Sequence, residues 1–311
     1  MTKYLVTGGA GFIGTNLVKT LLADGHQVVV LDNYAGGKKE ERFLAGAEYI
    51  EGDIRNDADL DKACHGVDGI FHLAALPRVT FSVEHPEEAH DANVNGTLKL
   101  LLAAKKHKVK RLVFASSSSV YGNQPTMPMV ETMTPMPISP YGLHKLVGEH
   151  YCRLFVDLFG VETVSLRYVN VYGPYFDPDG PYALVVGKFI KQAKNNEPMT
   201  VCGDGEYRRD FVHVSDVAVA NLLAMESERV GKGEVINISS GRSFSVNYVR
   251  GLIGEKFIFV PERPGDALKT EEDNTKAKQL LGWEPTITLE DGIKELKREW
   301  GITVPSSLSP R

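Results

Sequence analysis

Residues 7–14 read TGGAGFIG, and this glycine-rich stretch decides the fold. An apolar run precedes it at residues 4–6, and a helical pattern follows at residues 13–23. Between a strand and a helix, glycines let the backbone turn tightly, while the helix N-terminus offers unpaired N–H groups to a phosphate. The stretch therefore predicts a strand–turn–helix unit that binds a dinucleotide through Gly8, Gly11, Phe12, Ile13 and Gly14.

The same alternation of strand and helix continues through the first half of the chain. Buried strands are predicted at residues 4–6, 28–31, 69–73, 112–114 and 163–166, and helices at residues 13–23, 57–64, 92–107 and 141–159. Right-handed crossovers between such units build a doubly wound parallel sheet with helices on both faces. The predicted fold class is therefore α/β, with a sheet of the Rossmann type.

The character of the chain changes after Arg167, where prolines, glycines and aromatic residues cluster at residues 172–178. Such a cluster is typical of a loop. We expect a dinucleotide-binding domain made of residues 1–167 and about 211–238. A smaller, mixed α/β lobe, made of residues 168–210 and about 239–311, would close over the substrate.

Acidic and small residues follow the other strands, at the edge of the sheet where ligands bind. Asp32 comes 18 residues after the last glycine, close to the usual spacing of roughly 20 for an acid that binds the adenosine ribose. Its charge would repel a 2′-phosphate and favours NAD, although Lys38 and Lys39 leave NADP open. Asp53 and Ile54 are expected near the adenine, with helix capping as the alternative for Asp53. The next strand is followed by residues that leave backbone accessible, Leu73, Ala74 and Ala75.

Three polar residues form the predicted chemical centre. Tyr141 and Lys145 are four residues apart, which places them on one face of a helix that Pro140 begins. A phenol is a poor base at neutral pH, but a neighbouring ammonium and a positively charged nicotinamide stabilise the phenolate. Tyr141 could then take a proton from a substrate hydroxyl as hydride leaves. Ser117, in the serine run at residues 116–119, could hydrogen-bond the same oxygen.

The bulk composition limits the remaining function classes. The formal net charge of −5 and the lack of a long basic run argue against nucleic-acid binding. No apolar stretch is long enough for a membrane span, and the N-terminus leaves no room for a signal peptide, so the cytoplasm is expected. Three widely spaced cysteines match no metal site and suggest a reducing compartment.

Several motifs, in order along the chain, resemble those of the extended short-chain dehydrogenase/reductase family, and specifically of its nucleotide-sugar epimerases. They are TGGAGFIG at residues 7–14, ASSSSVYG at 115–122, SPYGLHK at 139–145, LRYVNVYGP at 166–174 and RDFVHVSDV at 209–217. The resemblance implies bound NAD and a UDP-sugar substrate. It adds cofactor contacts from Asn33, Asn93 and Val169. The chain departs from the family at Pro77 and Ala92, beside cofactor contacts, which bears on how firmly NAD is retained.

The resemblance also implies a substrate site that reaches into the smaller lobe. Arginine suits bidentate phosphate binding, and surface charge is the alternative for Arg209 and Arg263. Ordinary packing or solvent exposure is the alternative for Leu184, Val185 and Lys188. The implied substrate contacts are Ser117, Ser118, Asn170, Leu184, Val185, Lys188, Arg209, Arg263 and Asp266.

The serine run separates the reactions found in the family. Its 4,6-dehydratases carry an Asp–Glu pair directly after the catalytic Ser or Thr, and its decarboxylases usually carry a Glu at the second position. Ser118 and Ser119 stand there instead, which implies C4 epimerisation of a UDP-hexose through a 4-keto intermediate. UDP-glucuronate stays open as the substrate, since Arg78 or Lys188 could meet a carboxylate. A dehydratase, decarboxylase or reductase also stays open, as does a non-catalytic dinucleotide-binding protein.

One residue bears on which sugar is accepted. Thr270 falls where the family has a residue that borders the sugar. A small residue there leaves room for an N-acetyl group, which predicts UDP-GlcNAc and UDP-GalNAc as substrates beside UDP-Glc and UDP-Gal.

The family also implies a homodimer, formed through a four-helix bundle by the helices at residues 93–107 and 141–159. Their apolar residues could equally pack only against the sheet, and the sequence pattern does not separate these two faces. They are Leu98, Leu101, Leu102, Val147, Tyr151, Leu154 and Leu158.

Overall fold

The computed structural model describes residues 1–177, 185–262 and 269–302. Its centre is a seven-stranded sheet in the order β10-β6-β5-β4-β1-β2-β3, and each neighbouring pair is parallel. The strands are β1 Lys3–Thr7, β2 Gln27–Asp32, β3 Ala47–Glu51, β4 Gly69–His72, β5 Arg111–Ser117, β6 Glu162–Tyr168 and β10 Lys232–Ile238. From β1 the chain adds β2 and β3 on one side, and then β4 and the later strands on the other side. The point between β1 and β4, where the strand order reverses, is the switch point at which such sheets bind ligands.

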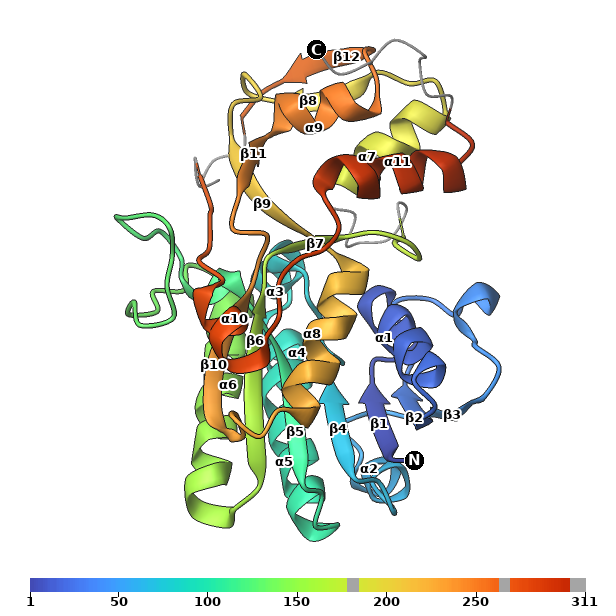
Figure 1. The fold of residues 1–311 in the computed structure, drawn as a ribbon, viewed down its shortest axis with the longest axis vertical. Coiled ribbons are helices and arrows are strands. Elements are labelled where there is room, and N and C mark those ends of the chain that lie inside the picture. Colours follow the sequence, from blue (N-terminus) through green and yellow to red (C-terminus); the bar gives the residue numbers. More distant parts are fainter. Residues whose placement is uncertain (178–184, 263–268, 303–311) are drawn as a thin grey trace.

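Helices cover both faces of this sheet (Figure 1). The core on one face is shared with α1 Phe12–Ala23 and α8 Val214–Glu226, and the core on the other with α2 Asp57–Ala63, α5 Gly96–Lys106 and α6 Pro140–Phe159. Leu5 and Val6 are neighbours in β1 and lie in opposite cores, because successive side chains of a strand point to opposite faces. The predicted doubly wound α/β fold is confirmed.

Short helical turns lie near the ends of the central strands. They are η1 Glu40–Arg42, α3 Val79–Glu84, α4 Pro86–His90, η2 Asp91–Asn95 and η3 Ser118–Val120. The helix predicted at residues 92–107 differs from the observed one at its start, where the chain forms the π-helical turn η2 before it continues as α5. The wider backbone pairing of a π turn leaves no periodic signal in residue types, so the sequence did not indicate it. β10 also lies where we predicted no strand.

The smaller lobe lies at one end of the molecule (Figure 1). It packs around its own apolar core. It contains a three-stranded sheet of β7 Asn170–Tyr172, β9 Arg208–His213 and β11 Ser243–Ser245, and a two-stranded sheet of β8 Met199–Cys202 and β12 Phe257–Val260. Its helices are α7 Val185–Lys194, α9 Val246–Ile253 and α11 Leu289–Glu299. The domain division predicted from the sequence stays a prediction. The structure adds that α10 Thr275–Leu281 contacts β10 and α8 of the larger lobe.

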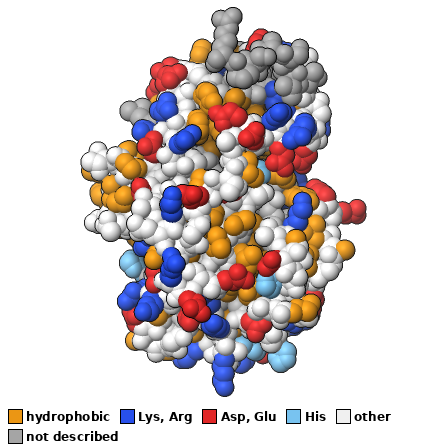
Figure 2. Space-filling view, in the orientation of Figure 1, with side chains coloured by type: hydrophobic (Ala, Val, Ile, Leu, Met, Phe, Trp, Pro, Cys, Tyr) orange, Lys and Arg blue, Asp and Glu red, His pale blue; other side chains and the backbone are white. Residues whose placement is uncertain are grey.

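The surface combines both signs of charge. Lys and Arg side chains are interspersed with Asp and Glu side chains over the face that Figure 2 shows. Within the three described ranges, no helix is long and apolar enough to cross a membrane.

Candidate active site

The glycine turn between β1 and α1 is packed so closely that only hydrogen fits at two of its positions. Gly8 has a φ of 72°, and a Cβ there would lie 2.7 Å from the backbone nitrogen of Ala74. A Cβ on Gly14 would lie 2.2 Å from the carbonyl oxygen of Gly8. Gly11 is the N-cap of α1 and supplies no side chain to its first N–H groups. The turn therefore presents bare backbone and a helix N-terminus, which together suit a pyrophosphate.

Asp32, at the end of β2, connects this turn to the loop that follows. Its carboxylate accepts the N–H of Ala10 at 3.0 Å and the N–H of Tyr34 at 2.8 Å. Burial raises the pKa of Asp32, while these two donors and the nearby Arg42 oppose that shift. The carboxylate is thus fixed beside the glycine turn, where the sequence placed the ribose-binding acid.

Asp53, after β3, is held by charged and polar neighbours. Its carboxylate accepts hydrogen bonds from the Arg55 guanidinium at 2.8 and 2.9 Å and from the Asn33 amide at 2.9 Å. The hydrogen bonds from Arg55 lower the pKa of Asp53 to about 2. The capping alternative is not what the structure shows, because Asn56 caps α2. Ile54 is buried and contacts the α5 residue Gly96 so closely that a Cβ there would lie 2.6 Å from its side chain.

Arg42 belongs to the same region, although no motif in the sequence singled it out. Its guanidinium is buried and donates to the Tyr175 carbonyl at 2.6 Å and to the Ala10 carbonyl at 3.4 Å. Lys39 forms an ion pair with Asp177 at 2.8 Å. The loop after β2 therefore holds the segment that leads into the smaller lobe. The only signal in the sequence was the charge of this loop, which does not say which cation turns inward.

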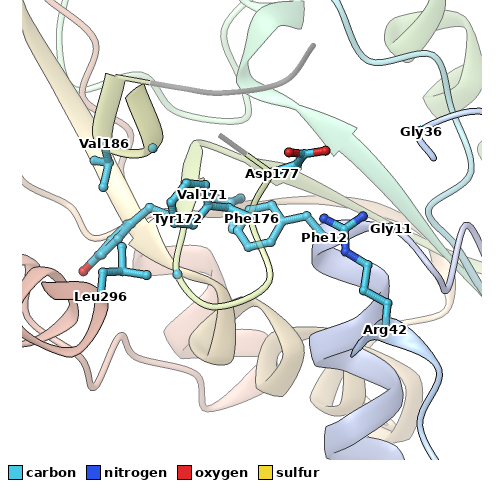
Figure 3. Close-up of a pocket in the computed structure, with 12 residues that line it drawn as sticks. Gly11, Phe12, Gly36, Arg42, Val171, Tyr172, Phe176, Asp177, Val186 and Leu296 are labelled. Carbon is cyan, nitrogen blue, oxygen red and sulfur yellow. The ribbon is translucent and has the colours of Figure 1, made fainter. Parts of the chain in front are cut away.

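A pocket lies between the glycine turn and the smaller lobe, and Figure 3 shows its walls. Phe12 and Arg42 border it from the side of the larger lobe, and Tyr172, Val186 and Leu296 border it from the other side. Of the predicted cofactor residues, Gly11 and Phe12 line this pocket. It adjoins the helix N-terminus where the pyrophosphate is expected.

Buried hydrogen bonds organise the strand end next to the switch point. The Leu73 N–H bonds to the Thr7 carbonyl at 3.1 Å, so β4 leaves the sheet in contact with the glycine turn. The Asn93 amide accepts the Leu76 N–H at 2.7 Å and donates to the Leu76 carbonyl at 3.1 Å. The structure thus gives Asn93, predicted as a cofactor contact, a role in fixing the backbone after Ala74 and Ala75.

Tyr141 and Lys145 lie in the first turns of α6, as predicted. Ser139 is the N-cap of this helix and accepts the Gly142 N–H at 3.1 Å, with Pro140 in the first helical position. The Lys145 ammonium donates to the Ala115 carbonyl of β5 at 2.7 Å and lies 5.8 Å from the centre of the Tyr141 ring. Burial lowers the pKa of Lys145 to about 8.

Ser117 ends β5 and caps the short turn η3. Its hydroxyl donates to the Ser119 hydroxyl at 3.0 Å and accepts the Ser119 N–H at 3.2 Å. The start of α6 approaches this turn closely, since a Cβ on Gly142 would lie 2.6 Å from the Ser119 carbonyl oxygen. The fold therefore brings the serine turn and the Tyr–Lys helix together at one edge of the sheet.

The substrate residues predicted from the resemblance fall into two groups. Leu184, Arg263 and Asp266 lie outside the described residues. The Asn170 amide donates to the Asp210 carbonyl at 2.7 Å, and the Arg209 guanidinium donates to the Arg208 carbonyl at 2.9 Å. The others occupy the start of α7 (Val185, Lys188), η3 (Ser118) and the stretch beside β9 (Thr270). Val169, predicted as a cofactor contact, lies between β6 and β7.

Comparison with known proteins agrees with this geometry. A model of the NAD dependent epimerase/dehydratase family matches residues 4–239. A putative UDP-glucose 4-epimerase of Methanocaldococcus jannaschii is 41% identical over 94% of this chain and 96% of its own length.

Solved structures resemble the whole fold. The UDP-glucose 4-epimerase of Thermotoga maritima, solved with UDP-glucose, is 40% identical with a TM-score of 0.90 and covers 96% of this chain and 98% of its own. A UDP-N-acetylglucosamine 4-epimerase of Methanobrevibacter ruminantium M1, solved in complex with UDP-N-acetylmuramic acid, is 35% identical with a TM-score of 0.88. The match covers 96% of this chain and 99% of the other. The protein therefore belongs to the NAD dependent epimerase/dehydratase family, in agreement with its glycine turn and Tyr–Lys helix.

Proposed function

We propose that the protein epimerises UDP-hexoses at C4, with NAD as its cofactor and a 4-keto sugar as the transient intermediate. The substrates are UDP-Glc and UDP-Gal, UDP-GlcNAc and UDP-GalNAc. The observation that carries this proposal is the position of Tyr141 and Lys145. They lie beside the serine turn, at the sheet edge that also bears the glycine turn.

The chain's own residues fit the cofactor. Gly8 and Gly14 leave bare backbone where a Cβ would collide, and the N-terminus of α1 is free of a side-chain cap. The fixed carboxylate of Asp32 suits a ribose with free hydroxyls and disfavours a 2′-phosphate. A bound NAD⁺ would supply the hydride acceptor, and its reduced form would supply the hydride donor for the opposite face of the ketone.

The catalytic residues divide the proton chemistry between them. Tyr141 takes the proton of the C4 hydroxyl, and Ser117 hydrogen-bonds the same oxygen. Lys145 is held against β5 by its hydrogen bond to Ala115, and its positive charge favours the phenolate form of Tyr141. Asn170 and Arg209 face the substrate from the smaller lobe, and Arg209 suits the diphosphate.

The test of this function is incubation of the protein with UDP-Glc, UDP-GlcNAc and UDP-glucuronate, each with catalytic NAD⁺. Chromatography or NMR would resolve the C4 epimers. Conversion of a UDP-hexose to an equilibrium mixture of epimers, without a change of mass, is expected. A product of changed mass, or net NADH, would instead point to a dehydratase, decarboxylase or reductase. If UDP-glucuronate alone were converted, the substrate would be a UDP-hexuronate and not a UDP-hexose.

The size of residue 270 provides a prediction about the sugar. The backbone N–H of Thr270 donates to the Arg208 carbonyl at 3.0 Å, so the backbone cannot shift easily to make room for a larger side chain. We expect Thr270→Tyr to lower kcat/KM for UDP-GlcNAc at least about tenfold and that for UDP-Glc by less than about threefold. Parallel kinetics on the two substrates would measure this. Equal losses on both would mean that residue 270 does not border the N-acetyl group.

The structure supplies a surface for the homodimer that we also propose. On α5, Leu101 is fully buried against the sheet, whereas Leu102 is 47% exposed. On α6, Leu154 and Leu158 are 47% and 67% exposed. These outward leucines lie on the two helices expected to form the bundle, and burying such an apolar face against a second copy favours association.

Replacing Leu154 and Leu158 on α6 together is expected to abolish the dimer. Leu154→Glu combined with Leu158→Glu would place four charges in a two-fold interface, so sedimentation velocity should report a monomer. The matched control is Val219→Glu on α8, where an apolar side chain is 43% exposed on a different helix. A dimer that survives the double substitution would exclude this face.

A cytoplasmic location is also part of the proposal. All three cysteines are free thiols, and Cys64 and Cys152 are buried. Unpaired cysteines are typical of proteins that work in a reducing compartment.

A further inference from the structure

Residues 269–273 form a stretch whose side chains alternate between two environments. Backbone bridges hold the stretch against β9 and against the loop before α6. Successive side chains of an extended chain point to opposite faces. Lys269 and Glu271 form an ion pair on one face at 3.0 Å. Thr270 and Glu272 therefore lie on the opposite face, which places Glu272 on the side predicted to border the sugar.

The carboxyl group of Glu272 is buried without a hydrogen-bond partner. The residue is 1% exposed, and neither carboxyl oxygen has a partner among the described residues. Its backbone is fixed, because the Ser239 hydroxyl donates to its carbonyl at 2.8 Å. The adjacent Glu271 differs, since it accepts the Ser243 hydroxyl at 2.7 Å and pairs with Lys269. A charged carboxylate without partners is strongly disfavoured in such a place.

A second buried carboxyl group, that of Asp210 on β9, accepts a hydrogen bond from the Glu272 backbone and lies close enough for its negative charge to act on Glu272. Asp210 is 0% exposed, but its oxygens accept the N–H and the hydroxyl of Ser240 at 2.9 and 2.7 Å and the Gly241 N–H at 3.1 Å. Burial raises the pKa of Asp210 to about 7, but these donors and the Glu272 N–H act in the other direction and favour its ionised form. Two interacting buried carboxyls do not ionise together readily, so the proton belongs on the one without donors.

The charged groups around Glu272 agree with this assignment. Burial raises the pKa of Glu272, and the negative charges of Asp210 and Glu271 raise it further. The Ser118 hydroxyl and the Arg209 guanidinium act in the other direction. The interaction with Ser118 does not reach the geometry of a full hydrogen bond, since both carboxyl oxygens have no partner.

We propose that Glu272 is a positioning residue, a neutral carboxylic acid that donates its proton in a hydrogen bond to the Ser118 hydroxyl. This inference rests on the proposed function, in which Ser118 lies beside the sugar. A hydroxyl has one proton to donate. While Glu272 is neutral, Ser118 accepts from it and keeps its own O–H for a sugar oxygen. When Glu272 ionises at higher pH, Ser118 donates to the carboxylate instead and is lost to the sugar.

Substrate kinetics at several pH values test this role. In the wild type, KM for the UDP-hexose should rise with pH as Glu272 ionises and Ser118 turns toward it. In Glu272→Gln the amide donates to Ser118 at every pH, so KM should stay within about threefold of the wild-type value at low pH and should not rise with pH. Glu272→Leu supplies no donor and should raise KM on the order of tenfold, with a smaller change in kcat.

Two further variants test whether Ser118 is the hydrogen-bond partner of Glu272 and provide a control. Ser118→Ala should raise KM to a similar extent, and adding Glu272→Leu to it should have little further effect, since both changes remove one interaction. Glu271→Gln is the matched control. Glu272 and Ser118 remain in this variant, so KM should still rise with pH, at a lower pH than in the wild type because the Glu271 charge is lost. A rise of KM with pH that persists in Glu272→Gln, or additive effects in the double variant, would overturn the proposal.

The protonation of Glu272 also has a readout that needs no enzyme activity. The unfolded chain releases this proton near the ordinary Glu pKa of about 4.3, whereas the native state keeps it to higher pH. The free energy of unfolding of the wild type should therefore fall as pH rises from about 5 toward 8, more steeply than that of Glu272→Gln. Parallel pH curves would show that native Glu272 is ionised, whereas loss of epimerisation in the wild type would refute only the proposed function.

Discussion

Replacement of Tyr141 by Phe is expected to lower kcat for C4 epimerisation by roughly 10²–10⁴-fold, the usual contribution of a positioned acid or base. Phe keeps the ring and its packing but cannot accept the proton of the C4 hydroxyl. Because the backbone N–H of Tyr141 is held by the Ser82 hydroxyl at 3.1 Å, the start of α6 should keep its position. KM should therefore change much less than kcat.

The pH dependence of the wild type should reflect Lys145, the positive neighbour of this phenol. Burial lowers the pKa of Lys145 to about 8, so its ammonium loses its proton as the pH rises through that value. The charge that stabilises the Tyr141 phenolate then disappears, and kcat/KM of the wild type should fall on the alkaline side.

The measurement is a comparison of epimer formation by wild type, Tyr141→Phe and Tyr151→Phe. Tyr151 lies on the same helix and is partly buried, so its variant removes a phenol hydroxyl outside the chemical centre. It should keep wild-type kcat. If Tyr141→Phe retained more than about half of the wild-type rate, another group would have to accept the C4 proton.

Gly14→Ala is expected to have the largest effect on stability among single-methyl additions in the glycine turn. The new Cβ would lie 2.2 Å from the Gly8 carbonyl oxygen, which is backbone and cannot rotate away. The turn and α1 would have to separate, and α1 contributes Leu17, Val18 and Leu21 to the core. We expect a loss of about 3 kcal/mol or more in the free energy of unfolding, at the upper end of what overpacking produces.

Gly251→Ala is the matched control, because this glycine also lies in a helix, α9, but a Cβ there meets nothing within 4 Å. That variant should gain up to about 1 kcal/mol, the difference in helix propensity between glycine and alanine. Urea unfolding at constant pH measures both, provided that the slope of the transition is unchanged. If Gly14→Ala were as stable as the wild type, the turn would open easily. Its glycines would then be needed only for the close approach of a ligand.

Part of the site was predictable from the sequence because it depends on short spacings along the chain. The glycine turn, the acid at the end of β2, and the Tyr–Lys pair at the start of α6 all belong to single strand–helix units. Within such units, local periodicity decides which side chains share a face. The order of strands and helices then followed from the few ways in which these units can be connected.

Other parts depend on contacts between distant segments, which no local pattern contains. Leu101 and Leu102 are equivalent in residue type, and only the packing of α5 on the sheet buries the first and exposes the second. Arg42 and Lys38 share a loop, yet Arg42 turns inward to the Tyr175 carbonyl while Lys38 pairs with Glu51 on the surface.

The acidic pair at residues 271 and 272 shows the same limit most clearly. Glu271 and Glu272 are identical in sequence terms, but pairing with β9 and with the loop before α6 fixes which faces outward. The sequence by itself determined the sheet, its cofactor turn and its Tyr–Lys helix, because local spacing and chain connectivity specify them. Only the tertiary structure decided which equivalent residues are buried, because burial depends on partners far away in the chain.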